Sequence, residues 1–266
     1  MSNILNLIRC LKCGSTSLRF SESEIVCEKC GNSYPIYNGI PVTYQGEDFL
    51  KSNNVKVFET LTERYDQWFD EERGKILFEN ELRAIKTLLK RIQIRDSLEI
   101  GVGTGRFASM LKIKYGLDPA IKPLLLAKER GIEVIQGIAE MLPFRDKIFD
   151  TVFLIVTICF VKDLEKTLSE AKRVLREGGY IVIGYIDRES EWGKFYLKKK
   201  EMGHPFYASA KFYTFNELEE ILKKIDFKIK NVVSTLSSSP QAVKIEKPVE
   251  GYTPQHGFIT ILARKQ

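Results

Sequence analysis

Residues 98–108 read LEIGVGTGRFA, and this stretch decides the class of fold. An apolar run over 97–100 ends in three alternating glycines, Gly101, Gly103 and Gly105, and an amphipathic stretch follows. That order is typical of a buried strand, a tight turn and the start of a helix. Glycine lets the backbone come close to a ligand, and the first turn of a helix offers unpaired N–H groups. We therefore expect a polar ligand at this turn.

Strand-like and helix-like stretches alternate from residue 97 onward, which predicts a parallel sheet with helices on both faces. The expected strands are 97–101, 113–117, 132–136, 149–156 and 180–186, and the expected helices are 105–112, 119–130, 164–176 and 214–226. Two further strand candidates, 227–234 and 257–264, have no helix between them. They should pair as an antiparallel hairpin at the sheet edge. The prediction is an α/β fold with a doubly wound, mostly parallel sheet of seven strands.

The composition is that of a globular protein with a sizeable core. The 266 residues are 44% hydrophobic and 29% charged, with a net charge of +6. No apolar run approaches the length of a membrane span, and the N-terminus lacks the apolar core of a signal peptide. We therefore expect a cytoplasmic protein that does not bind a membrane. The charge permits a nucleic-acid partner without requiring one.

Four of the five cysteines form the pattern C-x2-C-x13-C-x2-C near the N-terminus. Paired C-x2-C motifs at this spacing predict a structural zinc site, and a disulfide framework is not expected in a chain without an export signal. Redox C-x-x-C pairs and an iron centre remain as minor alternatives. The intervening residues 18–26 predict a short hairpin. The expected metal ligands are Cys10, Cys13, Cys27 and Cys30.

The chain divides into three predicted parts. Residues 1–45 would form the zinc ribbon, 46–75 a linker and a helix that covers the cofactor, and 76–266 the large domain. The linker itself is expected over 46–54, and helical spacing follows over 57–89. The ribbon contains four basic and three acidic residues, so it is not a basic module that seeks RNA.

The glycine turn alone does not name its ligand. A nicotinamide site would favour G-x-G-x-x-G, whereas here Arg106 stands at the last glycine position. Glu99 lies two residues before the first glycine, and the next strand candidate runs into Asp118. An acid at that strand end can accept hydrogen bonds from both ribose hydroxyls, and it lies at the sheet edge where ligands of open α/β sheets bind.

Several motifs in order resemble the class I S-adenosylmethionine (SAM)-dependent methyltransferases, especially their type 11 branch. The resemblance covers about residues 60–265. Besides LEIGVGTG and Asp118, it rests on GIAEMLPF over 137–144, FDTVFLIVTICFV over 149–161 and LREGGYIVIG over 175–184. It implies SAM as the cofactor. The residues that it implies for cofactor binding are Tyr65, Glu99, Gly101, Gly103, Gly105, Asp118, Pro119, Ala139, Glu140, Met141 and Thr157.

The ribbon also resembles a known family. After the second cysteine pair, residues 34–41 read YPIYNGIP, which is similar to the YPI-x-x-GIP stretch of Trm112-like zinc ribbons. The resemblance covers about residues 7–44. Separate members of that family bind and activate methyltransferases, and the resemblance implies that here the ribbon would be fused to the large domain. It could dock a substrate or a partner, or it could be a structural unit that only packs on the next domain.

The sequence names no clear catalytic base. Candidates are Thr157 and Cys159, after the fourth expected strand, and His204; His256 is a further one. A lone cysteine in an apolar run is more often an inert buried side chain, and either histidine can be a surface residue. Methyl transfer from a sulfonium is an in-line displacement that positioning alone can accelerate, so a missing base does not argue against an enzyme. The N-P-P-Y mark of adenine and glutamine methyltransferases is absent.

Three functions remain open on this basis. The first is methyl transfer to a small molecule in a lidded pocket, supported by a long aromatic insertion over 187–213. The second is methylation of ribosomal or transfer RNA, with the ribbon docking substrate or partner. The third is a non-catalytic SAM-binding regulator. Lys198–Lys200 could meet phosphates, but residues 187–230 contain ten basic and eight acidic residues, which favours a charged helical surface.

Overall fold

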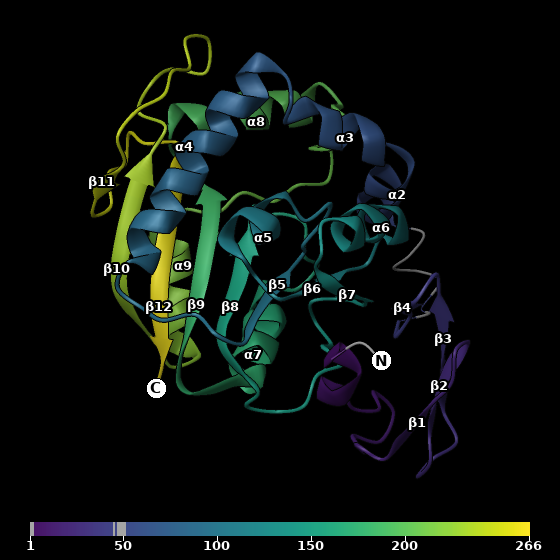
Figure 1. The fold of residues 1–266 in the computed structure, drawn as a ribbon. Helices are drawn as coiled ribbons and strands as arrows, with labels where there is room; N and C mark the ends of the chain where they lie inside the picture. The colour runs from purple at the N-terminus through teal and green to yellow at the C-terminus, as the bar shows by residue number, and fades with distance from the viewer. Residues whose placement is uncertain (1–2, 45, 47–51) are drawn as a thin grey trace.

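The computed structural model describes residues 3–44, 46 and 52–266, and Figure 1 shows a large α/β domain with a small β ribbon beside one edge. Most of the predicted linker over 46–54 lies outside the described residues. The predicted division into three parts therefore stays a prediction.

The central sheet has the order β11-β10-β12-β9-β8-β5-β6-β7. Strands β5 to β9 are parallel, whereas β12 is antiparallel to both β9 and β10. The bounds of the parallel strands are β5 Ser97–Ile100, β6 Tyr115–Asp118, β7 Glu133–Gln136, β8 Phe149–Ile155 and β9 Leu175–Ile186. The remaining strands are β10 Phe227–Thr235, β11 Val249–Glu250 and β12 Phe258–Lys265. The doubly wound sheet is confirmed, and the two-residue β11 is an addition that its short, exposed sequence does not reveal.

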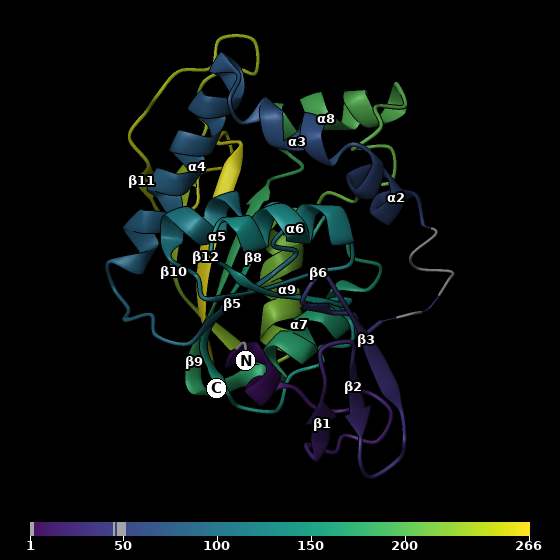
Figure 2. The same ribbon diagram turned by 45° about the vertical axis from the view of Figure 1, so that its right-hand side comes forward.

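Helices cover both faces of this sheet. Leu168 of α7 and Leu222 of α9 belong to one apolar core, while Leu77 of α4, Phe107 of α5 and Leu124 of α6 belong to the other. Figure 2 shows α5 and α6 on the opposite side of the sheet from α7 and α9. The bounds are α4 Glu72–Leu89, α5 Arg106–Leu111, α6 Ile121–Glu129, α7 Leu164–Val174 and α9 Phe215–Lys224.

Strand β8 shows why the sheet needs two covers. Val152 and Leu154 point into one core, while Phe153 and Ile155 point into the other, because successive side chains of a strand alternate between faces. A near-continuous apolar strand of this kind is stable only when both faces are buried. No helix among the described residues is long and apolar enough to cross a membrane.

Three further helices lie over the carboxyl ends of the parallel strands (Figure 1). They are α2 Asn53–Thr60, α3 Thr62–Trp68 and α8 Glu191–Glu201. Helix α8 begins where the Ser190 hydroxyl accepts a hydrogen bond from the Gly193 N–H. Ligands of open α/β sheets bind at this end, so these three helices form the roof of any site there.

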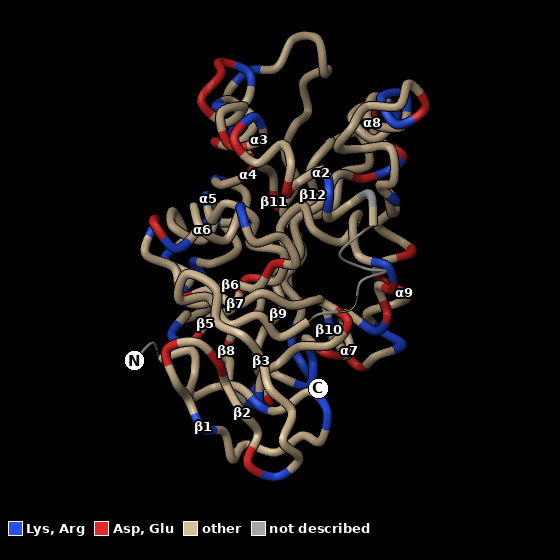
Figure 3. The backbone as a smooth tube through the Cα atoms, turned by 90° about the vertical axis from the view of Figure 1, so that its right-hand side faces the viewer, with Lys and Arg blue, Asp and Glu red and all other residues tan. Residues whose placement is uncertain are grey.

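The ribbon is a short 3-10 helix, η1, followed by a four-stranded antiparallel sheet. Its bounds are η1 Asn3–Leu7, β1 Leu18–Phe20, β2 Glu24–Cys27, β3 Ser33–Tyr37 and β4 Ile40–Pro41. Strands β1 and β2 form the predicted hairpin, with Leu18 opposite Cys27. Basic and acidic residues are interspersed along the backbone of the ribbon and its neighbouring segments (Figure 3).

The ribbon packs on the large domain through backbone bonds as well as apolar contacts. The Thr43 N–H donates to the Gln136 carbonyl at 3.0 Å, and the Arg9 N–H donates to the Pro143 carbonyl at 2.8 Å. Ile8 of the ribbon and Phe144 of the domain form a further bridge and lie in one apolar core. The ribbon is therefore attached to the edge strand β7 and to the loop that follows it.

Candidate active site

Each of the three positions in the turn favours glycine for its own physical reason. All have positive φ, at +73° for Gly101, +52° for Gly103 and +80° for Gly105, a region that other residues adopt at a cost. A Cβ on Gly101 would lie 2.3 Å from Cγ2 of Thr157, and one on Gly105 would lie 2.5 Å from Cδ1 of Ile132. A Cβ on Gly103 would lie 4.0 Å from its nearest neighbour, Cε1 of Tyr65. Open space for a ligand therefore lies above Gly103, while the other two glycines permit close packing.

Two adjoining cavities open at this turn. The larger has a volume of about 340 Å³ and the smaller about 100 Å³, and both are lined by Tyr65, Gly101 and Gly103. Of the predicted cofactor residues, the smaller cavity also holds Asp118, Pro119, Ala139, Glu140 and Thr157, and the larger also holds Glu99. Gly105 and Met141 line neither cavity. The fold thus brings most of the predicted cofactor residues together around the two cavities.

Two buried carboxyl groups flank the turn. Glu99 is 2% exposed and its Oε2 has no hydrogen-bond partner among the described residues. Burial, and then the charge of Asp118, raise the pKa of Glu99 well above its usual range. Asp118 accepts hydrogen bonds from the N–H groups of Gly103 and Ala120, and burial raises its pKa to about 6. An unpartnered buried carboxylate oxygen of this kind suits the ammonium group of a ligand.

Glu140, which lines the smaller cavity, also has one carboxylate oxygen without a hydrogen-bond partner among the described residues. Its Oε1 accepts hydrogen bonds from the backbone N–H groups of Lys162 at 2.7 Å and Asp163 at 3.2 Å. Its Oε2 is buried and has no partner among the described residues. Glu140 therefore fixes the start of α7 and still offers one acceptor to the cavity.

The turn after β8 contains a strained residue that the sequence does not reveal. Val156 has a φ of +52°, which is costly for a β-branched side chain. The Cys159 thiol donates to the Val156 carbonyl at 3.6 Å, and burial raises the pKa of Cys159 to about 12. A neutral, hydrogen-bonded thiol is a poor nucleophile, which favours the interpretation of Cys159 as an inert buried side chain. Thr157 bonds to the Ile155 carbonyl at 3.0 Å.

Arg106 holds the roof helix α3 to the glycine turn. Its guanidinium donates to Asp66 at 2.8 Å and to Asp70 at 2.7 Å, and Arg130 of the loop after α6 donates to the same Asp66 oxygen at 2.7 Å. Burial alone would raise the pKa of Asp66, but these two guanidinium groups lower it below its usual range. This pairing explains why an arginine stands where a nicotinamide-binding turn has glycine.

Replacing Asp66 with asparagine should loosen the roof. Asp66 is 14% exposed and Arg106 is 18% exposed, so the change leaves two guanidinium groups without their shared carboxylate. We expect the free energy of unfolding in urea to fall by about 2–3 kcal/mol. The matched change Asp70→Asn removes a side chain that is 63% exposed and should cost less than about 1 kcal/mol. Equal losses in the two variants would contradict this role of Asp66.

The larger cavity is walled by aromatic rings. Phe195, Tyr196, Phe206, Tyr207, Phe212 and Tyr213 of the predicted aromatic insertion all line it. Trp192 lies behind them and donates its indole N–H to the Ser238 carbonyl at 2.8 Å. His204 also lines the cavity, and burial lowers its pKa, with Lys199 and Arg64 adding to the effect. His256 lines neither cavity.

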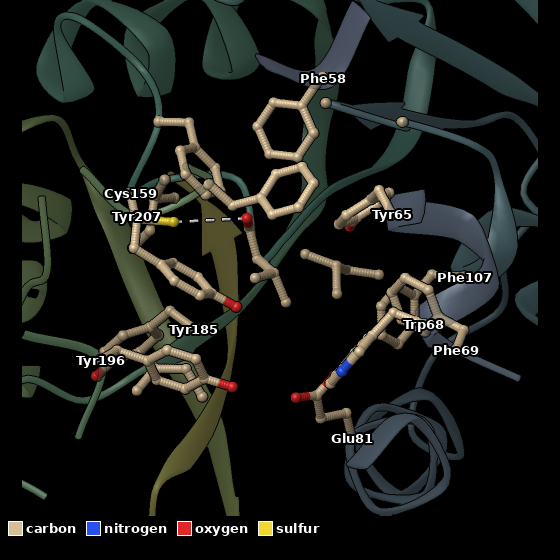
Figure 4. A pocket seen from close by; sticks show the side chains of 18 of the residues that line it. Phe58, Tyr65, Trp68, Phe69, Glu81, Phe107, Cys159, Tyr185, Tyr196 and Tyr207 are labelled. Atoms are coloured by element: carbon tan, nitrogen blue, oxygen red, sulfur yellow. Dashed lines mark hydrogen bonds between the residues drawn. The ribbon is translucent and has the colours of Figure 1, made fainter. Parts of the chain in front are cut away.

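Glu81 of α4 is a cavity residue that sequence reasoning missed. It is 8% exposed, and its side chain points into the larger cavity toward the tyrosines (Figure 4). Burial raises its pKa to about 8. In the sequence it is one of three glutamates on an amphipathic helix, with Glu72 and Glu79, and no spacing marks it as the buried one.

The four ribbon cysteines converge at one point. Their Sγ atoms all lie within 4.8 Å of one another, with 3.6 Å between Cys10 and Cys30 and 3.6 Å between Cys13 and Cys27. Four thiolates about 2.3 Å from a tetrahedral zinc would be separated by about 3.8 Å, so the arrangement fits that ion. Each pair also closes the same turn, since the N–H groups of Gly14 and Gly31 donate to Cys10 and Cys27 at 2.8 Å.

Comparisons with known proteins agree with this geometry. The methyltransferase domain family matches residues 98–183. A SAM-dependent methyltransferase of Thermotoga maritima, described as a possible histamine N-methyltransferase, is 39% identical and has a TM-score of 0.73. The match covers 80% of this chain and 99% of that one. The chain belongs to the SAM-dependent methyltransferases.

Two more relatives show how far the methyltransferase resemblance extends. An uncharacterized protein of Methanocaldococcus jannaschii is 40% identical over 213 residues, which is 79% of this chain and all of that protein. A chain from the Haloferax volcanii complex that contains the Trm112 methyltransferase activator shares the fold, with a TM-score of 0.60 at 16% identity. The match covers 79% of the present chain and 96% of the Haloferax volcanii chain.

Proposed function

We propose that this methyltransferase transfers the methyl group of SAM to a small molecule bound in the larger cavity. The observation that carries the proposal is the aromatic cavity of about 340 Å³ that adjoins the glycine turn. A volume of that size suits a small molecule, and aromatic walls keep water from the reacting groups. The Thermotoga maritima relative, described with a small-molecule acceptor, supports the same class.

In this proposal SAM lies across both cavities. Asp118 would bind the ribose, and Pro119, Ala139 and Glu140 would flank the adenine in the smaller cavity. Glu99 would accept from the ammonium of the methionine part, because its Oε2 has no other partner among the described residues. Gly105 and Met141 would act from behind, through packing. Tyr65, held between Phe58 and Phe69 by edge-to-face contacts, would cover the cofactor.

The chemistry needs positioning more than acid–base help. When SAM is bound it supplies a methyl group on a cationic sulfur, and an acceptor lone pair displaces that sulfur in line. The strained turn at Val156 and Thr157 lies between the cavities, where it can hold the acceptor and cofactor at attack distance. Cys159 has no covalent role in this scheme.

The substrate class is tested by supplying SAM with a labelled methyl group to the purified protein with either a small-metabolite extract or total RNA. We expect label in the small-molecule fraction and none in RNA. The ribbon favours this outcome, since it lies beside β7 with a mixed surface charge (Figure 3). Label in RNA alone would overturn the proposal.

We further propose that Cys10, Cys13, Cys27 and Cys30 hold one zinc ion. Bound zinc would fix the ribbon against the loop over 137–145, where the Arg145 N–H donates to the Leu7 carbonyl at 2.9 Å. That loop also carries Ala139 and Glu140 of the smaller cavity. In this proposal the ribbon has a structural role that reaches the cofactor site.

A further inference from the structure

Glu81 is a buried acid that has no partner among the described residues. Its carboxyl group receives no hydrogen bond and forms no ion pair with the described residues, although the side chain is only 8% exposed. Leaving a carboxylate unpaired in an apolar place carries a large solvation penalty. Such a group destabilises the empty protein, and groups of this kind are concentrated at functional sites.

The walls around Glu81 are aromatic and partly unsatisfied. Figure 4 shows Tyr65, Tyr196 and Tyr207 around the same space. The Tyr185 hydroxyl, which lines the cavity, is buried and has no partner among the described residues. The faces of aromatic rings attract cations, and this attraction grows when the site excludes water. The deep part of the cavity thus combines one negative group with rings that favour positive charge.

Basic side chains also line the cavity: Arg64, Arg73, Arg106, Lys199 and Lys211. Arg64 is exposed, and the ammonium of Lys211 lies 5.0 Å from the ring centre of Tyr213. Arg106 is bonded to Asp66 and Asp70. Arg73 lies two helical turns before Glu81 on α4, about 12 Å along the axis. Its guanidinium lies 5.3 Å from the ring centre of Phe195, and the ammonium of Lys199 lies 4.9 Å from the same ring. Arg73 and Lys199 are therefore stacked on a ring, and neither forms an ion pair with Glu81 in the part of the chain that the structure describes.

We propose that the acceptor is a small amine whose ammonium group binds beside Glu81, with its apolar body against the tyrosines. This inference rests on the proposed function and adds the class of acceptor to it. Glu81 is not among the residues that the proposed function assigns to SAM, so it can take this role. A carboxylate surrounded by aromatic rings recognises an ammonium by charge, whereas an alcohol or a carboxylic acid gains no such attraction.

Glu81 also solves a chemical problem for an amine acceptor. An ammonium has no free lone pair, so it must lose a proton before it can attack. The Glu81 carboxylate takes that proton, and the freed lone pair forms a bond to the methyl carbon of SAM. The carbon–sulfur bond breaks with its electron pair remaining on sulfur, which becomes a neutral thioether, and the product is a methylated ammonium. Burial raises the pKa of Glu81 to about 8, so the carboxyl group holds a proton near neutral pH when no ligand is bound. A bound ammonium favours the carboxylate form, and the raised pKa makes that carboxylate a better base for this step.

The test compares three ligands that share one body and differ in the polar group: 2-phenylethylamine, 2-phenylethanol and phenylacetate. Binding to the full chain is measured by calorimetry with S-adenosylhomocysteine present, and methylation with labelled SAM. We expect the amine to bind at least tenfold more tightly than the other two and to be the one methylated. Equal binding, a preference for phenylacetate or no binding of the amine would overturn the inference without any variant.

The variant Glu81→Gln keeps the shape of the side chain and removes its charge. We expect it to lose the tenfold preference for the amine and to lower kcat/KM for the amine at least 100-fold, while the Kd for SAM changes less than twofold. Glu72→Gln alters an exposed acid at the start of the same helix and should change neither value. An unchanged amine preference in Glu81→Gln would refute the assignment. Failure of the wild type to bind SAM would instead refute the proposed function.

Discussion

Replacing Cys27 and Cys30 together with serine should abolish zinc binding and unfold the ribbon. Zinc binding to small cysteine-rich units supplies on the order of 10 kcal/mol of folding free energy, and a ribbon of this size buries too little apolar surface to replace it. We expect about one zinc per chain in the wild type and none in the double variant. The melting temperature should fall by several degrees, because Ile4 and Ile8 leave the core that they share with Phe144.

The same variant should also weaken SAM binding, and a matched control separates this effect from a general loss of thiols. Cys159→Ser removes a thiol outside the ribbon and should leave the zinc content at about one per chain. Full retention of the metal by the double variant, or loss of the metal in Cys159→Ser, would contradict the proposed zinc site.

Replacing Gly101 with alanine should abolish measurable SAM binding. The residue has a φ of +73°, and a Cβ there would lie 2.3 Å from Cγ2 and 2.5 Å from Oγ1 of Thr157. The left-handed conformation alone costs about 1–2 kcal/mol for alanine, and the clash must also displace the turn after β8. We expect the Kd for SAM, measured by calorimetry, to rise at least 100-fold.

Gly131 offers a control with the same backbone conformation and no clash. Its φ is +84°, and no atom lies within 4 Å of a Cβ built there. Gly131→Ala should therefore lower the free energy of unfolding by about 1–2 kcal/mol and leave the Kd for SAM unchanged. If both variants bound SAM like the wild type, the turn at Gly101 would not be part of the cofactor site.

Much of the large domain could be predicted because its strands and helices alternate with clear periods. The strand at 149–156 is a good example, since only a sheet buried on both faces accepts such a continuous apolar run. The edge strand β11 could not be predicted, because it consists of only two residues, Val249 and Glu250, and both are exposed. Helix α9 lies within the predicted range 214–226 and begins at a capping box, in which the Thr214 and Glu217 side chains each bond to the other's backbone.

The site divides in the same way. The motif residues Gly101, Gly103 and Asp118 meet at the adjoining cavities, and their roles toward SAM remain predictions. Sequence could not find Glu81 or Val156. The first depends on which face of α4 lines the cavity together with Tyr196 and Tyr207, and the second on a backbone conformation that valine rarely adopts. Both come from tertiary contacts that no local pattern records.

The measurement that tests the account most directly is a calorimetric titration of the full chain with SAM, repeated with Asp118→Ala. We predict a micromolar Kd for the wild type. The variant should bind at least tenfold more weakly, a loss of about 1.4 kcal/mol, because the ribose hydroxyls lose their acceptor. Absence of SAM binding to the wild type, or equal affinity in the variant, would contradict the proposed cofactor site.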